Sequence, residues 1–499
     1  MKKISILLIL AMLISVFTLS FSSCKKDKEG DTTESKGTVT NDSNKIQYNL
    51  APEDLGEFEL DVLTVKSGQW NMHTDFAPTS LSGAKVNEAV YNRNMMVQDL
   101  YNATIIAHED ADYYKGTEKL SMDQLTGNAV YEAAYVEGSS VITVITQDLL
   151  HNLYDVNELQ LDEEWWSQLI KKEATLGSGK YSTLNFIQSN LSLTAFDLTW
   201  CVYFNKTLQS QHELDDFYDM VKNNQWTVET MQAAAKTVAN VNGDDSFVYR
   251  EDGASVYGIT TYWNGVKAML DGCNVQFVTT DENDEIVPNI DNERFVNLAQ
   301  DLANLCASEG VFTTGGPSTD GTTKGNASDY IKIFNANRAL FCVAEVKSSV
   351  SDFNAFQGEF GILPLPKYNT AQTEYRSWVN YLAPVLVIPT SSQGDTLHKT
   401  ALLLDVLSFY SERDVLPEYY DVVLKGRGAK DAQSVEMLDY INGSKSFDAS
   451  IAYGWSRQFS EVLSSTIQQG VSDVSSLIGT YNDMIKENIA ATMEDVFKD

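Results

Sequence analysis

The residue patterns that nucleotide and hydrolase chemistry require are mostly missing from this chain. The segment Gly177-Ser178-Gly179-Lys180 is similar to a phosphate-binding loop, but Ala174 stands where that motif needs its first glycine. Tyr181 follows the lysine where a serine or threonine would hold magnesium. The sequence also has no HExxH, no GxSxG and no set of kinase motifs. The absence of these motifs argues against a nucleotide-dependent enzyme, a metalloprotease and a serine hydrolase.

Metal chemistry has little support either. No two of the five histidines are spaced like metal ligands: His73, His108, His151, His212 and His398. Residues 240–245 place side-chain oxygens around Gly243, as calcium loops do, but the acids are incomplete and no glutamate closes the loop. A solvated turn accounts better for that stretch. We therefore expect no metal site, no cofactor and no catalytic residue.

Carboxylate pairs occur, but they do not identify a glycosidase. The chain has 69 acidic residues, so pairs such as Glu163-Glu164 arise by chance. Glycosidases need two carboxyl groups at a defined separation in space, and spacing along the chain does not give that distance.

The first residues have the pattern of an export signal. Lys2 and Lys3 precede an apolar run over residues 4–21, and Ser22-Ser23-Cys24 follow. A cysteine after two small residues is typical of a bacterial lipobox, so we expect residues 1–23 to be a lipoprotein signal peptide and Cys24 the lipidation site. An uncleaved membrane anchor is the alternative, because the run is close to the roughly 18–20 residues that a span needs.

The composition behind the signal indicates a folded, exported body. Residues 24–55 are rich in charged and small polar residues, and we expect a flexible tether. A chain of 499 residues predicts two or more domains. The 36 basic residues leave a net charge of −33, which argues against nucleic-acid binding because that requires a basic face. Cys201, Cys273, Cys306 and Cys342 show no CxxC spacing, and we expect buried thiols.

Alternating strand and helix patterns predict an α/β layered fold. Strands are expected over 57–65, 102–107, 130–136, 360–365 and 383–388. Helices are expected over 84–101, 141–150, 214–221, 228–238 and 295–305, with Thr227 as an N-cap, and through most of the chain after Lys399. A loop rich in Gly, Thr and Ser is expected over 310–325. Strand–helix–strand alternation favours sheets covered by helices.

Four segments, in this order, carry a family resemblance. They are Tyr203-Phe204-Asn205-Lys206 with Asn224-Gln225-Trp226-Thr227 downstream; the FNANRALF stretch at 334–341 with FGILPLPK at 360–367; 379–389; and 417–426. Together they resemble the extracellular solute-binding proteins of bacterial ABC importers, especially the carbohydrate-binding group similar to maltose-binding protein. Tyr381-Leu382 departs from the family, in which small glycines are common there.

The resemblance implies a two-lobe, periplasmic-binding-protein-like fold of type II. Hinge strands would join the lobes, and a ligand would bind in the cleft between them. We expect the N-terminal lobe to comprise residues 56–180 and 328–375, and the C-terminal lobe to comprise 181–327 and 376–499.

A carbohydrate site needs aromatic rings for the C–H faces of sugars and fixed polar groups for their hydroxyls. The resemblance and the expected elements suggest these ligand contacts: Trp70, Glu137, Ser139, Asp197, Trp200, Trp263, Glu345, Trp378, Asn380, Tyr453 and Trp455. Asp197 and Trp200 are expected on a strand near the hinge, and Trp455 resembles a late aromatic that stacks on sugar in relatives. Core packing is the alternative for Trp70 and Trp263, and helix capping for Glu137 and Ser139.

The resemblance implies a monomeric, non-catalytic receptor that is lipid-anchored at the extracytoplasmic face of the cell membrane. It would capture a carbohydrate, in particular an oligosaccharide, and deliver it to an ABC permease. Two alternatives remain: a surface glycan-binding lipoprotein built of helical repeats, and a secreted glycoside hydrolase.

Overall fold

The structure is a computed structural model that describes residues 47–497 except 67, 73–75, 284, 315–325, 327, 425–431 and 472. Residues 47–499 form one compact unit. The expected signal peptide, Cys24 and most of the expected tether lie outside the described residues. Within the described ranges, no helix combines the length and the apolar composition that a membrane span needs.

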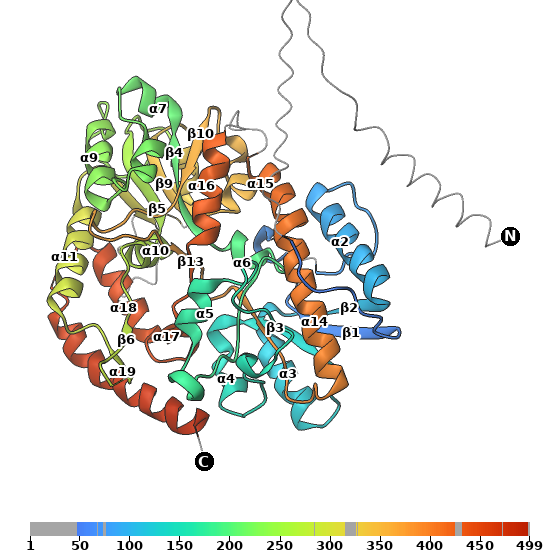
Figure 1. Ribbon diagram of the computed structural model, residues 1–499. Coiled ribbons are helices and arrows are strands. Elements are labelled where there is room, and N and C mark those ends of the chain that lie inside the picture. The colour runs from blue at the N-terminus through green and yellow to red at the C-terminus, as the bar shows by residue number, and fades with distance from the viewer. Residues whose placement is uncertain are drawn as a thin grey trace, which may run out of the picture. The chain divides into compact units, whose positions relative to one another are not determined.

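The first main sheet has four strands in the order β12-β3-β1-β2. They are β1 (Phe58–Thr64), β2 (Ala103–Glu109), β3 (Ala133–Glu137) and β12 (Pro384–Val387). β1 runs parallel to β2 and β3, whereas β12 runs antiparallel to β3 with Pro384 opposite Glu137. Parallel neighbours need crossover connections, and α2 (Lys85–Tyr101) and α3 (Gly116–Leu125) supply them on opposite sides of β1 (Figure 1).

The second main sheet has five strands in the order β10-β4-β9-β5-β8. They are β4 (Trp200–Asn205), β5 (Tyr257–Tyr262), β8 (Val311–Thr314), β9 (Ala339–Glu345) and β10 (Phe360–Leu363). β5 runs parallel to β8 and β9, and β4 runs antiparallel to β9 and β10. Its covering helices include α9 (Val228–Val238), α10 (Asn264–Gly272), α11 (Glu293–Ala307), α12 (Asp329–Asn335) and α16 (Ala432–Gly443).

The remaining elements are mostly short. Long helices late in the chain are α14 (Asp395–Tyr410), α15 (Leu416–Leu424), α18 (Arg457–Gln468) and α19 (Ser475–Val496), with the π-helical turn η7 (Ser411–Val415) joining the first two. The short α-helices are α4 (Ile142–Ile145), α5 (Gln168–Ala174), α6 (Thr194–Asp197), α7 (Lys206–Gln211), α8 (Phe217–Lys222), α13 (Ser348–Ser351) and α17 (Ala449–Ala452). The 3-10 turns are η1 (Gln69–Asn71), η2 (Tyr113–Lys115), η3 (Gly138–Ser140), η4 (Leu153–Asp155), η5 (Gly179–Tyr181) and η6 (Phe353–Ala355). Two small ladders pair β6 (Val278–Thr280) with β7 (Ile286–Pro288), and β11 (Ser377–Trp378) with β13 (Lys445–Ser446).

Most of the predicted elements are confirmed, within a few residues at their ends. Thr227 caps α9 as expected, since its hydroxyl accepts from the N–H of Thr230 while the Thr230 hydroxyl accepts from the N–H of Thr227. Cys201, Cys273, Cys306 and Cys342 are buried thiols, also as expected. The presence of two large sheets excludes the helical-repeat alternative.

Three predicted segments differ from the structure. The helix expected over 141–150 is wrong beyond Ile145, because Asp148 adopts a left-handed backbone conformation with φ of 57° and Leu150 pairs with Pro389. The helix expected over 214–221 begins only at Phe217, where Asp216 caps it. The loop expected over 310–325 starts with strand β8, and residues 315–325 lie outside the described part.

The expected division into lobes is wrong for residues 328–375 and for the start of 376–499. β9 and β10 lie in 328–375, but both pair with β4 in the second sheet. β12 pairs with β3 in the first sheet, and α14 and α15 pack on α2 beside it. The chain therefore passes from the first sheet to the second and back more than once, and the sequence order of the segments does not reveal which sheet each joins.

The segments that pass between the two sheets bring one edge of each sheet together. The N–H of Asn380 donates to the carbonyl of Leu198 at 3.0 Å, and the N–H of Val346 donates to the carbonyl of Thr199 at 2.8 Å. Thr199 also pairs with Val379 in an isolated bridge. The carboxyl ends of β3 and β9 consequently lie at the same junction.

A buried ion triad joins the two lobes behind this junction. Arg376 contacts Glu173 at 2.6 Å and Asp271 at 2.9 Å through its two terminal nitrogens. Glu173 lies on α5, in the segment whose Ile187 pairs with Leu386 of the first sheet, whereas Asp271 lies on α10 after β5 of the second. Burial alone would lower the pKa of Arg376, but Asp271 and Glu173 hold it above its usual value. The guanidinium therefore stays charged between both lobes.

Replacing Arg376 with methionine should lower the free energy of unfolding by about 3–5 kcal/mol, because two buried carboxylates lose their counter-charge. The free energy of unfolding of Arg376→Lys should lie between those of wild type and Arg376→Met. An ammonium keeps the charge but lacks the planar fork that meets both carboxylates. The measurement is urea unfolding followed by circular dichroism. Arg250→Met is the matched control, because Arg250 pairs with Asp252 at 3.0 Å on the surface. Equal midpoints for Arg376→Met and this control would contradict the structural role of the triad.

Candidate functional site

The candidate site lies where strands of both sheets end at the crossovers. Glu137 ends β3, Glu345 ends β9, and Trp200 begins β4 directly opposite Glu345. Ligands of layered α/β proteins bind outside the carboxyl ends of strands, at such junctions. We call the residues gathered here the strand-end cluster: Trp70, Tyr113, Glu137, Ser139, Trp200, Trp263, Lys267, Glu345, Lys347, Trp378, Asn380, Tyr381, Arg457 and Glu461.

Aromatic rings dominate the cluster. The ring centroids of Trp200 and Trp378 are 5.9 Å apart, and those of Trp378 and Tyr381 are 6.3 Å apart. In the first lobe, the ring centroids of Trp70 and Tyr113 are 5.1 Å apart. Trp70 is 38 % exposed. These separations are typical of tilted and edge-on ring pairs, so the rings are held in place by one another.

One polar group crosses from the second lobe to the first. Lys347 pairs with Glu345 at 3.1 Å and also donates to the backbone carbonyl of Trp70 at 3.2 Å. The amide of Asn380 donates to Glu345 at 3.3 Å. Burial raises the pKa of Glu345 above its usual value, and the Lys347 ammonium opposes this shift. The carboxylate is therefore held between a cation and an amide at the edge of both lobes.

A second polar group is centred on Glu461 of α18. Glu461 accepts from Lys267 at 2.6 Å and from the hydroxyl of Tyr381 at 3.0 Å. The Lys267 ammonium also sits over the rings of Trp263, at 4.3 Å, and of Tyr381, at 4.9 Å. Burial lowers the pKa of Lys267 to about 8, although Glu461 works against that shift. Arg457 lies over the same Tyr381 ring at 5.3 Å.

The first lobe contributes a carboxyl and a hydroxyl at the end of β3. The hydroxyl of Ser139 donates to Glu137, and the two residues flank Gly138 at the start of η3. Burial raises the pKa of Glu137, while the Ser139 hydrogen bond and the Arg457 charge lower it. Gly138 allows no side chain here, because an added Cβ would lie 2.4 Å from the ring of Phe447.

Trp200 holds a buried donor that nothing in the described part of the chain accepts. The residue is 2 % exposed, and its indole N–H has no hydrogen-bond partner there. Buried indole N–H groups normally find an acceptor. The unsatisfied donor therefore marks a position in the cluster where an acceptor is expected.

Eight of the eleven residues suggested by the sequence come together in this cluster: Trp70, Glu137, Ser139, Trp200, Trp263, Glu345, Trp378 and Asn380. The other three have different surroundings. Asp197 ends helix α6 rather than lying on a strand, and in the interior it accepts from Tyr419 at 2.5 Å. Tyr453 and Trp455 stack on each other with ring centroids 4.9 Å apart. The hydroxyl of Tyr453 donates to the carbonyl of Ala174, and the indole N–H of Trp455 donates to the hydroxyl of Thr492.

Sequence reasoning missed Tyr113, Lys267, Lys347, Arg457 and Glu461. Each reaches the cluster through a partner far along the chain, such as Tyr381 for Glu461. A weak signal existed for two of them: Lys267 stands four residues after Trp263 in a helix, and Lys347 stands two residues after Glu345. Tyr381, where the sequence departs from the family, belongs to the cluster. Its ring contacts Lys267 of α10, and its hydroxyl donates to Glu461 of α18.

No family model matches this chain, and no curated protein sequence matches it. Solved structures do match over most of its length. A cyclo/maltodextrin-binding protein complexed with maltotetraose gives a TM-score of 0.55 at 11% identity, covering 86% of this chain and 97% of that one. UspC from M. tuberculosis gives 0.55 at 12% identity, covering 86% and 100%.

The galacto-N-biose-/lacto-N-biose I-binding protein of an ABC transporter from Bifidobacterium longum, in complex with lacto-N-biose, is also similar. It gives a TM-score of 0.52 at 12% identity, covering 88% of this chain and 98% of that one. Identities this low establish a shared fold alone. The chain thus has the two-lobe, periplasmic-binding-protein-like fold found in sugar-binding proteins of ABC transporters.

Proposed function

We propose that the protein is the carbohydrate receptor of an ABC importer. It captures a sugar, in particular an oligosaccharide, between its lobes and delivers it to the membrane permease. Cys24 would carry the lipid that holds the receptor at the extracytoplasmic face of the cell membrane. The shared fold supports this proposal, because two of the neighbours described above are named as binding proteins for maltodextrins and lacto-N-biose.

The observation that carries the proposal is the mixture of rings and paired charges in the strand-end cluster. Trp200, Trp378 and Tyr381 are buried in this arrangement, and opening of the lobes would expose their ring surfaces to the C–H faces of a sugar. Glu345 and Glu137 offer carboxylates, and Lys347 offers an ammonium, for its hydroxyls. A hydroxyl oxygen would also accept from the indole N–H of Trp200, which has no acceptor among the described residues.

The mechanism we propose is reversible closure of the lobes without bond-making. Trp70 and Glu137 come from the first lobe, whereas Glu345 and Lys347 come from the second. A sugar that touches both sets stabilises the arrangement in which they are close, as hinge closure around a ligand requires. The bond from Lys347 to the Trp70 carbonyl is then a contact of the closed form.

A thermal-shift screen against a library of mono- and oligosaccharides tests this function. A bound sugar should raise the melting temperature, because it stabilises only the folded state; at a hundredfold excess over Kd the gain is about 2.7 kcal/mol. Incubation of the same sugar with pure protein should leave it unhydrolysed. A library without any stabilising sugar would contradict the receptor proposal, and hydrolysis of the bound sugar would replace it with a glycosidase.

The variant Trp200→Phe should weaken binding of the sugar found in that screen by about five- to tenfold, because the N–H donor is lost. Stability should suffer less than in Trp226→Phe, the matched control that removes the same part of an indole. Trp226 is equally buried, but its N–H donates to the carbonyl of Pro364 at 2.9 Å. Calorimetric titration and urea unfolding give the two quantities. Unchanged affinity in Trp200→Phe would remove this residue from the site.

A further inference from the structure

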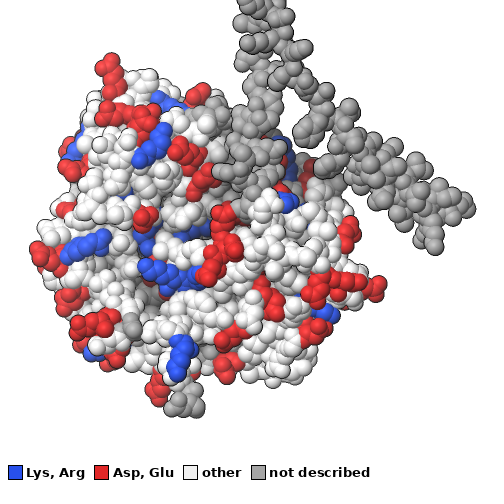
Figure 2. Space-filling model, viewed as in Figure 1, with Lys and Arg blue, Asp and Glu red and all other residues white. Residues whose placement is uncertain are grey.

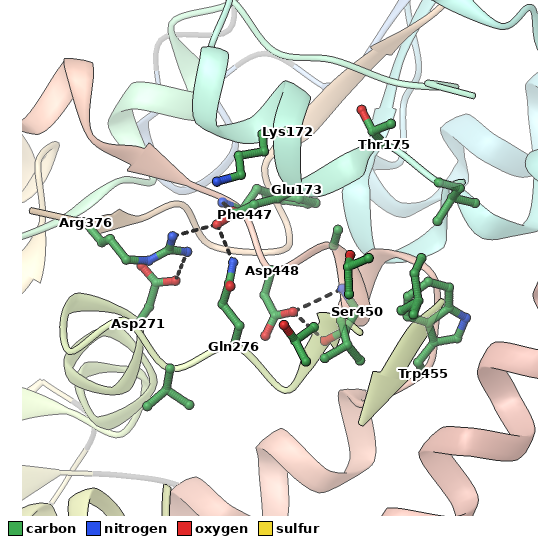
Figure 3. Close-up of a pocket in the computed structure, with 17 residues that line it drawn as sticks. Lys172, Glu173, Thr175, Asp271, Gln276, Arg376, Phe447, Asp448, Ser450 and Trp455 are labelled. Carbon is green, nitrogen blue, oxygen red and sulfur yellow. Dashed lines mark hydrogen bonds and ion pairs between the residues drawn. The ribbon is translucent and has the colours of Figure 1, made fainter. Parts of the chain in front are cut away.

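A cavity separate from the strand-end cluster opens beside α5. Its volume is about 290 Å³, and its walls come from α5, α10, the β6–β7 ladder, Arg376 and the segment from Phe447 to Trp455. That volume equals about ten water molecules at roughly 30 Å³ each. We call it the α5 pocket (Figure 3). On the face shown in Figure 2, Lys and Arg side chains gather where the surface is hollowed near α5.

Two of its carboxylates are already occupied by the protein. Glu173 accepts from Arg376, from the amide of Gln276 at 2.8 Å and from the N–H of Phe447 at 3.2 Å. Asp271 accepts from Arg376 and from the hydroxyl of Ser446. These acids therefore form the fixed frame of the pocket, and they are not the groups that would meet a ligand.

Three other polar groups on the pocket wall are not fully used. Asp448 takes both hydrogen bonds from Ser450 on one oxygen, and its second oxygen has no partner among the described residues. Lys172 forms no hydrogen bond or ion pair with the described part of the chain. Arg376 is 6 % exposed, and its Nε–H has no acceptor there. Figure 3 shows these side chains arriving from three separate elements, with Trp455 at the end opposite Arg376.

The chemistry of these groups selects the kind of ligand. The wall offers an acceptor on Asp448, donors on Lys172 and Arg376, and an indole on Trp455. A hydroxyl group donates and accepts at once, so a molecule with several hydroxyls can satisfy all three polar groups. A simple anion would leave Asp448 unsatisfied, and an apolar molecule would desolvate every charge on the wall. No group of three metal ligands occurs among the described residues.

The α5 pocket is also close to the strand-end cluster. Lys267 belongs to the cluster and Asp271 to the pocket, and the two stand four residues apart on α10, a rise of about 6 Å. Arg376 and Trp378 stand two residues apart at the start of β11. Arg376 lines the pocket, and Trp378 belongs to the cluster. The two sites are therefore neighbours in the fold.

From these observations we propose that the α5 pocket is a second saccharide-binding site that holds one sugar unit of an oligosaccharide whose other units occupy the strand-end cluster. This inference rests on the proposed receptor function and extends it to the length of the ligand. Asp448 and Lys172 bind hydroxyls of that unit. The preferred ligand is accordingly longer than a disaccharide.

The test compares short and long probes on matched variants by calorimetric titration. The probes are the disaccharide and the tetrasaccharide of the α-1,4-glucan, β-1,4-glucan, β-1,4-mannan and β-1,4-galactan series. Asp448→Asn keeps the N-cap of α17, because asparagine caps as well as aspartate does. Asp216→Asn is its control, since Asp216 caps α8 in the same way and does not line the pocket. Lys172→Met is compared with Lys236→Met on the exposed face of α9.

In the series that binds, wild-type protein should prefer the tetrasaccharide. Asp448→Asn and Lys172→Met should each weaken the tetrasaccharide by about tenfold and leave the disaccharide within about twofold of wild type. The two controls should match wild type for both lengths. Unchanged tetrasaccharide affinity in both pocket variants, or equal loss for both lengths, would overturn the second site while leaving the receptor function intact. Binding of none of the eight probes by wild-type protein would count against the receptor function itself.

Discussion

The buried triad of Glu173, Arg376 and Asp271 is the constraint on which the arrangement of the two lobes depends. Arg376 stands on the segment that returns from the second sheet to the first, and it contacts one carboxylate from each side. Buried charges are costly unless paired, so the three residues tolerate little relative displacement. The crossover strands are thereby fixed at one point, and Lys347 joins the strand ends beyond them through the carbonyl of Trp70.

This arrangement explains why the residues of the strand-end cluster collect where they do. The carboxyl ends of β3 and β9 meet at the crossovers, which is where ligands of layered α/β proteins bind. Aromatic residues from β4, β11 and the turn after β11 pack together there, and α10 and α18 add the ion pair between Lys267 and Glu461. Under the proposed function these side chains would contact a sugar from both lobes.

Much of this could be predicted from the sequence, and the failures have physical reasons. Local signals located β1, α2 and the capped start of α9, since periodicity and capping depend only on neighbours along the chain. The lobe assignment of residues 328–375 failed because strand pairing is long-range: β9 could have joined either sheet by pattern alone. In the site, Trp200 and Glu345 were found through the resemblance, whereas Arg457 and Glu461 depend on how α18 packs. Asp197 was misplaced because it ends a single helical turn that precedes the strand, which begins only at Trp200.

Small-angle X-ray scattering on the purified protein, with and without a sugar proven to bind, tests the central claim most directly. If the lobes close around their guest, the radius of gyration should fall when the sugar is added and should stay unchanged with a sugar that does not bind. An identical scattering curve for the empty and the saturated protein would contradict lobe closure as the way this molecule works.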